Sequence, residues 1–89
     1  MAPRHKKSLE EAFGEIIRSI REEHPGLSQE RLGQESGSGR TYVSELERGM
    51  RNPSLRTLFR LSRRLGVAPS EVVRRLEKDL GPMHALDLD

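Results

Sequence analysis

The chain has 89 residues, 16 of them Lys or Arg and 14 Asp or Glu, with no Cys and no Trp. This length allows one small domain, and the lack of Cys excludes disulfides, thiolate metal sites and cysteine nucleophiles and fits a cytoplasmic setting. No stretch reaches the roughly 20 apolar residues that a membrane-spanning helix needs, so neither a membrane anchor nor an export signal is expected.

A first helix is predicted over residues 8–23. A Ser followed three residues later by a Glu forms a capping box at its start. Apolar side chains then recur on one face of the spiral: Leu9, Phe13, Ile16, Ile17 and Ile20. The sequence HPG at 24–26 ends the helix, because proline disfavours helical backbone in the residue before it and glycine accepts a positive φ.

Two short helices follow, predicted over residues 29–36 and 40–48 with only three residues between them. A connection this short, with a glycine at its head, forces a sharp angle and predicts a helix-turn-helix. Glycine at position 33 is expected to let the two backbones approach closely, since a side chain there would project toward the third helix. The residues predicted to be structural in this unit are Gly33, Gly37, Val43 and Leu46.

Ser54 is predicted to cap a fourth helix that ends at Gly66, and Pro69 fits the first turn of a fifth helix that ends before Gly81. Four leucines are expected on the buried side of the fourth helix: Leu55, Leu58, Leu61 and Leu65. The fifth helix carries an apolar stripe of Val72, Val73, Leu76 and Leu80. The fold class predicted from these periodicities is all-α, a compact bundle of five helices.

Positive charge is concentrated in the middle of the chain, where seven arginines between residues 40 and 64 stand against Glu45 and Glu47. Such a block is typical either of a solvated surface or of a protein that binds a polyanion. The three histidines are far apart in the sequence, so neither a metal site nor a histidine general base is expected. No catalytic residue or cofactor is predicted, and the chain is not expected to be an enzyme.

Three segments resemble the Cro and phage-repressor type of helix-turn-helix domain, often called the XRE family: LSQERLG at 27–33, RTYVSELERG at 40–49 and RNPSLRTLFRLSRRLGV at 51–67. The resemblance runs from about residue 12 to 77. It implies a lambda-repressor-like bundle that binds double-stranded DNA as a homodimer and regulates transcription, with residues 40–48 as a recognition helix in the major groove.

The resemblance also implies roles for individual residues. Contacts to base edges are expected from the start of the recognition helix: Arg40, Thr41, Ser44 and Glu45. Arginine can donate to two acceptors of a guanine, and a glutamate can accept from a cytosine amine. Contacts to phosphates are expected from Gln29, Tyr42, Arg48, Arg51 and Asn52. For Arg51 and Asn52 the alternative is a plain surface turn, because NPS is a good local turn sequence.

Other positions are expected to act on structure. Glu47 matches a family carboxylate that pairs with an arginine of the first helix, and Arg21 is the candidate partner. Ser36 and Ser38 depart from the family, whose members usually have apolar residues beside the turn glycine, and this departure puts the packing of the turn in question.

The predicted domain occupies residues 8–80. A basic arm, residues 1–7, is hypothesised to run along DNA phosphates, and a tail, residues 81–89, either frays or packs against a second copy of the chain through Leu86 and Leu88. The surface expected to form the homodimer is apolar and lies near the end of the fourth helix and on the fifth, with Met50 as an addition.

Two alternatives stay open from the sequence. One is an antitoxin or adaptor that uses the same fold mainly to bind a protein partner. The other, within the regulator class, is a controller protein of a restriction-modification operon, since such proteins are small domains of this type. No small-molecule ligand is expected, and the location expected for all of these is the bacterial cytoplasm.

Overall fold

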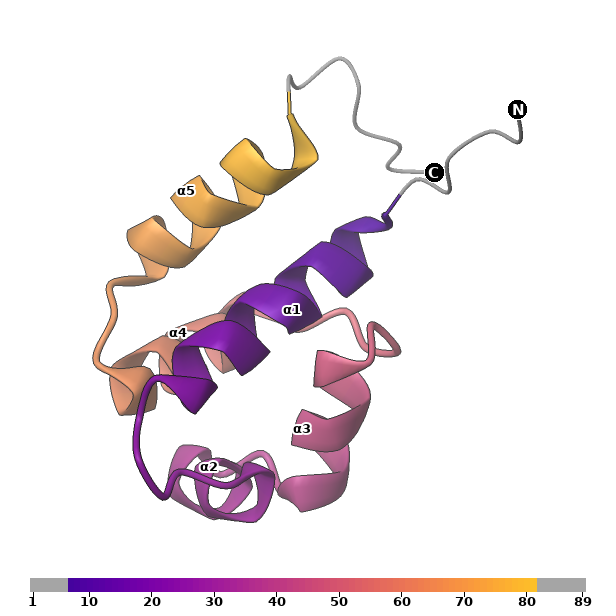
Figure 1. The fold of residues 1–89 in the computed structure, drawn as a ribbon. Coiled ribbons are helices and arrows are strands. Elements are labelled where there is room, and N and C mark those ends of the chain that lie inside the picture. Colours follow the sequence, from indigo (N-terminus) through magenta and orange to yellow (C-terminus); the bar gives the residue numbers. More distant parts are fainter. Residues whose placement is uncertain (1–6, 82–89) are drawn as a thin grey trace.

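The computed structural model describes residues 7–81, and this part of the chain forms five α-helices (Figure 1). They are α1 (Leu9–Glu22), α2 (Gln29–Ser36), α3 (Arg40–Glu47), α4 (Leu55–Leu65) and α5 (Pro69–Leu80). The predicted all-α fold class is confirmed. The tail beyond Gly81 and the basic arm before Lys7 lie outside the described residues. No helix within residues 7–81 is long and apolar enough to cross a bilayer.

The predicted caps explain where most helices begin. At the start of α1, the Ser8 hydroxyl accepts from the Glu11 amide over 3.0 Å, and the Glu11 carboxylate accepts from the Ser8 amide over 3.0 Å. Ser28 and Ser54 cap α2 and α4 in the same way, with backbone amides donating over 3.0 and 3.1 Å. These side-chain oxygens satisfy amides that a helix start leaves without an intrahelical partner.

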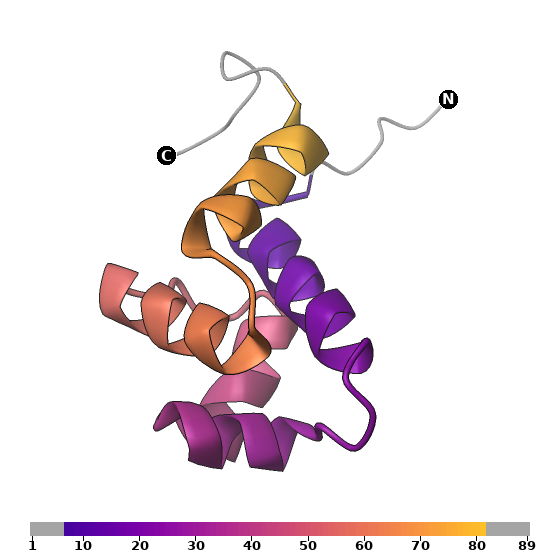
Figure 2. The ribbon, with the colours of Figure 1, turned by 90° about the vertical axis from the view of Figure 1, so that its left-hand side faces the viewer.

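One continuous core joins the helices. Its buried members are Phe13, Ile17, Ile20, Leu27, Leu32, Val43, Leu46, Leu58, Leu61, Leu65 and Val72. Helix α5 lies alongside α1, whereas α2 and α3 lie at the end of the molecule away from α5 (Figures 1 and 2). The pair α2 and α3 is therefore carried on a scaffold formed by the other three helices.

The approach of α1 to α3 depends on Gly14, which was not singled out in the sequence. A Cβ atom there would meet the carbonyl oxygen of Leu46 and would lie 3.0 Å from the carbonyl carbon of Glu47. These are backbone atoms in a helix, so they cannot move aside without displacing α3. Gly14 thus sets how closely α3 sits against α1.

Two apolar residues of the predicted helix faces are exposed. The prediction that Leu55 lies on the buried side of α4 is wrong, because Leu55 is 76% exposed; Val73, in the apolar stripe of α5, is 40% exposed. The reason is the helical spiral of about 100° per residue. Leu55 lies at the edge of the arc that the other three leucines of α4 share, and two turns later the same edge is occupied by Ser62, which is fully buried. Val73 is one step around the helix from Val72, which is also fully buried.

Candidate nucleic-acid interface

Helices α2 and α3 approach each other closely at Gly33. A Cβ atom there would lie 2.6 Å from the backbone nitrogen of Arg40, too close for any side chain. The Gly39 amide donates to the Gly33 carbonyl oxygen over 2.9 Å. Gly37 turns the chain between the helices with a φ of +79°, a conformation that favours glycine. The close approach expected at Gly33 is present, and it holds the two helices at a fixed angle.

The serines beside the turn do not prevent this geometry. Ser36 is buried, and its hydroxyl has no hydrogen-bond partner within residues 7–81. Ser38 is half-buried. Burying a hydroxyl without a partner costs about 1–3 kcal/mol. The departure from the family pattern therefore lowers stability and leaves the turn intact.

Helix α3 has one packed face and one outward face. Val43 and Leu46 are fully buried against the core, as predicted. On the opposite side, Arg40 and Thr41 are exposed and Ser44 is half-buried. Arg40 has no carboxylate at ion-pair distance among the residues that the structure describes. The outward face of α3 therefore presents two hydroxyl groups and a guanidinium that has no carboxylate partner within residues 7–81.

A buried ion pair ties α3 to α1. The Arg21 guanidinium donates from Nε to Glu47 Oε2 over 2.7 Å and from Nη2 to Glu47 Oε1 over 3.0 Å. The two side chains are only 12% and 2% exposed. These hydrogen bonds raise the pKa of Arg21 above its ordinary value. Arg21 Nη1 also donates to the Leu27 carbonyl oxygen over 3.0 Å, which anchors the connection before α2.

Gln29 joins this ion pair from the first residue of α2. Its side-chain nitrogen Nε2 donates to Glu47 Oε1 over 2.8 Å, so α1, α2 and α3 meet at one carboxylate. This bond uses one of the two amide hydrogens of Gln29. The other hydrogen remains for a ligand, next to the backbone N–H groups that a helix start leaves free. Such a helix end attracts anions.

A second cluster joins the middle of α3 to the loop that follows it. The Arg51 guanidinium donates from Nε and from Nη2 to the same carboxylate oxygen of Glu45, over 3.0 and 2.9 Å. The central carbon of this guanidinium lies 5.4 Å from the ring centroid of Tyr42, a distance that allows cation–π attraction. No pattern in the sequence indicated that these three candidate residues contact one another.

The remaining candidate residues are exposed. Arg48 follows the last turn of α3 and has no carboxylate partner in the described part of the chain. Asn52 lies in the loop before α4, where it lines a small apolar groove of about 130 Å³ together with Leu9 and Leu55. Asn52 is thus placed toward α1 and α4, and its neighbours do not form the outward face of α3.

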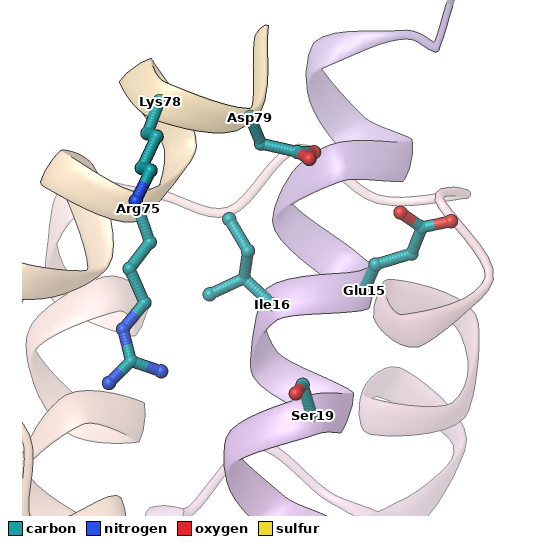
Figure 3. A pocket seen from close by; sticks show the side chains of 6 residues that line it. All are labelled: Glu15, Ile16, Ser19, Arg75, Lys78 and Asp79. Carbon is teal, nitrogen blue, oxygen red and sulfur yellow. The ribbon is translucent and has the colours of Figure 1, made fainter.

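A larger groove, of about 460 Å³, runs between α1 and α5 on the scaffold (Figure 3). Its acidic groups Glu15 and Asp79 both pair with Lys7, over 2.6 and 3.1 Å, and these contacts raise the pKa of Lys7. Arg75 pairs with Glu71 over 3.1 Å. Lys7 thus links α1 to the end of α5, whereas the Arg75–Glu71 pair lies within α5.

A family model described as helix-turn-helix matches residues 17–72, which is more than half of the chain. The chain belongs to the helix-turn-helix family. The matched range contains α2, α3 and α4 together with the buried ion pair. The resemblance seen in the sequence is therefore confirmed.

Several proteins named as control proteins or gene regulators are similar to this chain along most of their own length. The control protein C.BamHI of Bacillus amyloliquefaciens is 43% identical over 61 residues, which cover 68% of this chain and 75% of the relative. The solved structure of the restriction-modification controller protein C.AhdI from Aeromonas hydrophila is 42% identical with a TM-score of 0.66, covering 70% of this chain and 92% of that one. The clp gene regulator ClgR from Corynebacterium glutamicum is 29% identical with a TM-score of 0.77, covering 85% and 80%.

Proposed function

We propose that this protein is a sequence-specific regulator of transcription that binds double-stranded DNA with α3 in the major groove. The observation that carries the proposal is the first turn of α3, which exposes Arg40 with no carboxylate partner within residues 7–81 while the opposite face is packed on the core. A guanidinium left uncompensated at the tip of a rigid helix suits an acceptor outside the protein. Bacterial cytoplasm is the setting that such a function requires.

The roles follow from where each side chain lies. Arg40, Thr41 and Ser44 on the outward face of α3 read base edges, and each good bidentate arginine pair gives roughly 1–3 kcal/mol of discrimination. Phosphates are bound around this face by residues that fix the position of the protein without reading sequence: Gln29, Tyr42, Arg48 and Arg51. Asn52 was also expected to bind a phosphate, but it lies toward α1 and α4 and is left out of this set. Glu45 was expected to read a cytosine, but its carboxylate accepts from Arg51.

The protein acts as a homodimer in this proposal. One short recognition helix covers only a few base pairs, so specificity requires two copies on half-sites about one helical turn, roughly 34 Å, apart. Four large apolar side chains are exposed within residues 7–81: Met50, Leu55, Phe59 and Val73. Met50 lies in the loop before α4, Leu55 and Phe59 lie in the first half of α4, and Val73 lies on α5, whereas the sequence pointed to the end of α4, to α5 and to Met50.

A dimer interface of this kind is open to direct test. Leu55→Glu places a charge among these exposed apolar groups without entering the core. Light scattering should give a dimer mass for the native chain and a smaller mass for the variant. A native chain that stays a strict monomer, even on a duplex it selects, would exclude the dimer.

A controller protein of a restriction-modification operon is the second, narrower candidate. The similarity to C.BamHI and C.AhdI, both about two-fifths identical over most of their length, favours it. Genes for a restriction endonuclease and its methyltransferase beside this gene would support the narrower function, and a gene for a small toxin there would favour the antitoxin alternative.

The test of DNA binding itself is a titration of duplex libraries at several salt concentrations, followed by fluorescence anisotropy. A sequence-specific regulator should stay bound to its preferred duplex when competitor DNA of random sequence is added at about 150 mM salt. Arg40→Ala should remove this preference for one duplex over the competitor. Arg18→Ala is a matched control, because Arg18 is an exposed arginine on α1 that pairs with Glu22. If the two variants behave alike, α3 does not carry the recognition.

A further inference from the structure

The Glu45 carboxylate and the Arg51 guanidinium form a contact that needs an explanation. Glu45 was expected to face a base edge and Arg51 a phosphate, yet both N–H donors of the contact end on one oxygen, Glu45 Oε1, at 3.0 and 2.9 Å. The Arg51 guanidinium also lies over Tyr42. The long Arg51 side chain is therefore held in one position by Glu45 and Tyr42, which both belong to α3.

The backbone after α3 brings Arg51 back to this place. Gly49 has a φ of +79° and reverses the chain. The Met50 amide then donates to the carbonyl oxygen of Glu45 over 2.9 Å. Glu45 thus holds the loop by its main-chain carbonyl oxygen and holds Arg51 by its side-chain carboxylate. Both contacts fix the position of Arg51.

Exposure shows how little of the carboxylate faces outward. The Glu45 side chain is only 24% exposed although Thr41, one turn earlier on α3, is exposed, whereas the Arg51 side chain is 50% exposed. The guanidinium covers the acid. A bare carboxylate beside a DNA backbone would be repelled, and one held by an arginine is neutralised.

We propose that Glu45 is a positioning residue for Arg51 rather than a reader of bases, and that Arg51, held in this way against Tyr42, delivers its guanidinium to a backbone phosphate. The proposal rests on the DNA-binding function proposed above. An arginine has five N–H donors and Glu45 engages two of them, so three remain for a phosphate without breaking the pair. Fixing the side chain in advance removes part of the entropy cost of ordering it on DNA.

The experiment measures affinity for a selected duplex by fluorescence anisotropy, using native protein, Glu45→Gln, Arg51→Ala and the double variant. Glu45→Gln should weaken binding about threefold per half-site and about tenfold for a dimer, as expected for a half-exposed pair. The loss should be the same whichever base pair of the site is changed. In the Arg51→Ala background, Glu45→Gln should no longer weaken binding, because the residue it positions is gone.

Salt dependence separates positioning from mere structure. Arg51→Ala should lower the slope of log affinity against log salt by about one per protomer, the amount expected for one lost phosphate contact. Glu45→Gln should leave that slope unchanged, since the contact is still made. Glu35→Gln is the matched control: Glu35 also pairs with two arginines, Arg31 and Arg64, but it lies outside the proposed interface and should not alter binding.

Three results would overturn the inference. The first is a Glu45→Gln variant that loses preference at one base pair of each half-site, which is the behaviour of a reader. The second is a Glu45→Gln variant that weakens binding equally with and without Arg51. The third is tighter binding by Glu45→Gln, which would mean that Glu45 competes with DNA for Arg51. Failure of the native protein to select any duplex is a different result, and it counts against the proposed function.

Discussion

Replacing Glu47 with Gln should remove a large fraction of the free energy of unfolding without removing any DNA contact. The carboxylate is 2% exposed and accepts from Arg21 at 2.7 and 3.0 Å and from Gln29 at 2.8 Å. A neutral amide of nearly the same shape leaves the Arg21 charge buried without a counter-charge. It also places an NH₂ group where an acceptor is required.

The size of the effect follows from burial. Removing one partner of a buried ion pair costs about 3–5 kcal/mol, and a domain of this size has a total stability of order 5–10 kcal/mol. The loss is therefore a large fraction of the whole. With roughly 4–8 °C per kcal/mol for domains of 60–100 residues, the unfolding midpoint should fall by more than about 12 °C.

Urea unfolding followed by circular dichroism measures this change. Glu22→Gln is the matched control, because Glu22 forms an exposed pair with Arg18 and should cost less than about 1 kcal/mol. The double variant Arg21→Met with Glu47→Leu should regain much of the lost stability, since no unpaired charge remains. A Glu47→Gln protein as stable as the native one, yet unable to bind DNA, would refute this reasoning and place Glu47 in the interface.

Three further predictions concern packing and pH. Gly33→Ala should destabilise by about 1–3 kcal/mol in urea unfolding, because its Cβ would lie 2.6 Å from the Arg40 nitrogen; an unchanged midpoint would show that α3 can shift at no cost. Ser62→Ala should stabilise by about 1 kcal/mol, since the buried hydroxyl has no partner within residues 7–81, and a loss in the same assay would point to a hidden partner. Hydrogen bonds from Arg64 and Arg31 lower the pKa of Glu35 below its ordinary value of 4.5, so its contribution is present above pH 4.5 and lost as the pH falls through the lowered pKa; Glu35→Gln should flatten acid unfolding in that range, and identical acid curves would contradict the assignment.

Local signals in the sequence predicted the helices well. Caps such as Ser8 and stops such as Gly37 act over three or four residues, so they can be found without knowing the fold. The ends differ slightly: α1 ends at Glu22 and α3 at Glu47, with the next residue as the cap in each case. The pairing of Arg21 with Glu47 required the family pattern, because 26 positions separate the two residues.

Features that depend on how helices meet could not be predicted in this way. Gly14 matters only because α1 crosses the backbone of α3 at that point. Leu55 fits a leucine repeat, but it lies at the edge of the buried arc of α4 and is exposed. The contact of Arg51 with Glu45 arises from a chain reversal at Gly49 and a loop hydrogen bond, neither of which has a sequence pattern of its own.

The most direct test of DNA recognition by α3 is selection from a random duplex library at about 150 mM salt, with native protein and with Arg40→Ala. The account predicts that the native chain enriches a palindrome and that the variant loses preference at one position in each half-site. If nothing is enriched and the residual binding merely falls steeply with salt, the contacts are to phosphates alone, and α3 does not read sequence.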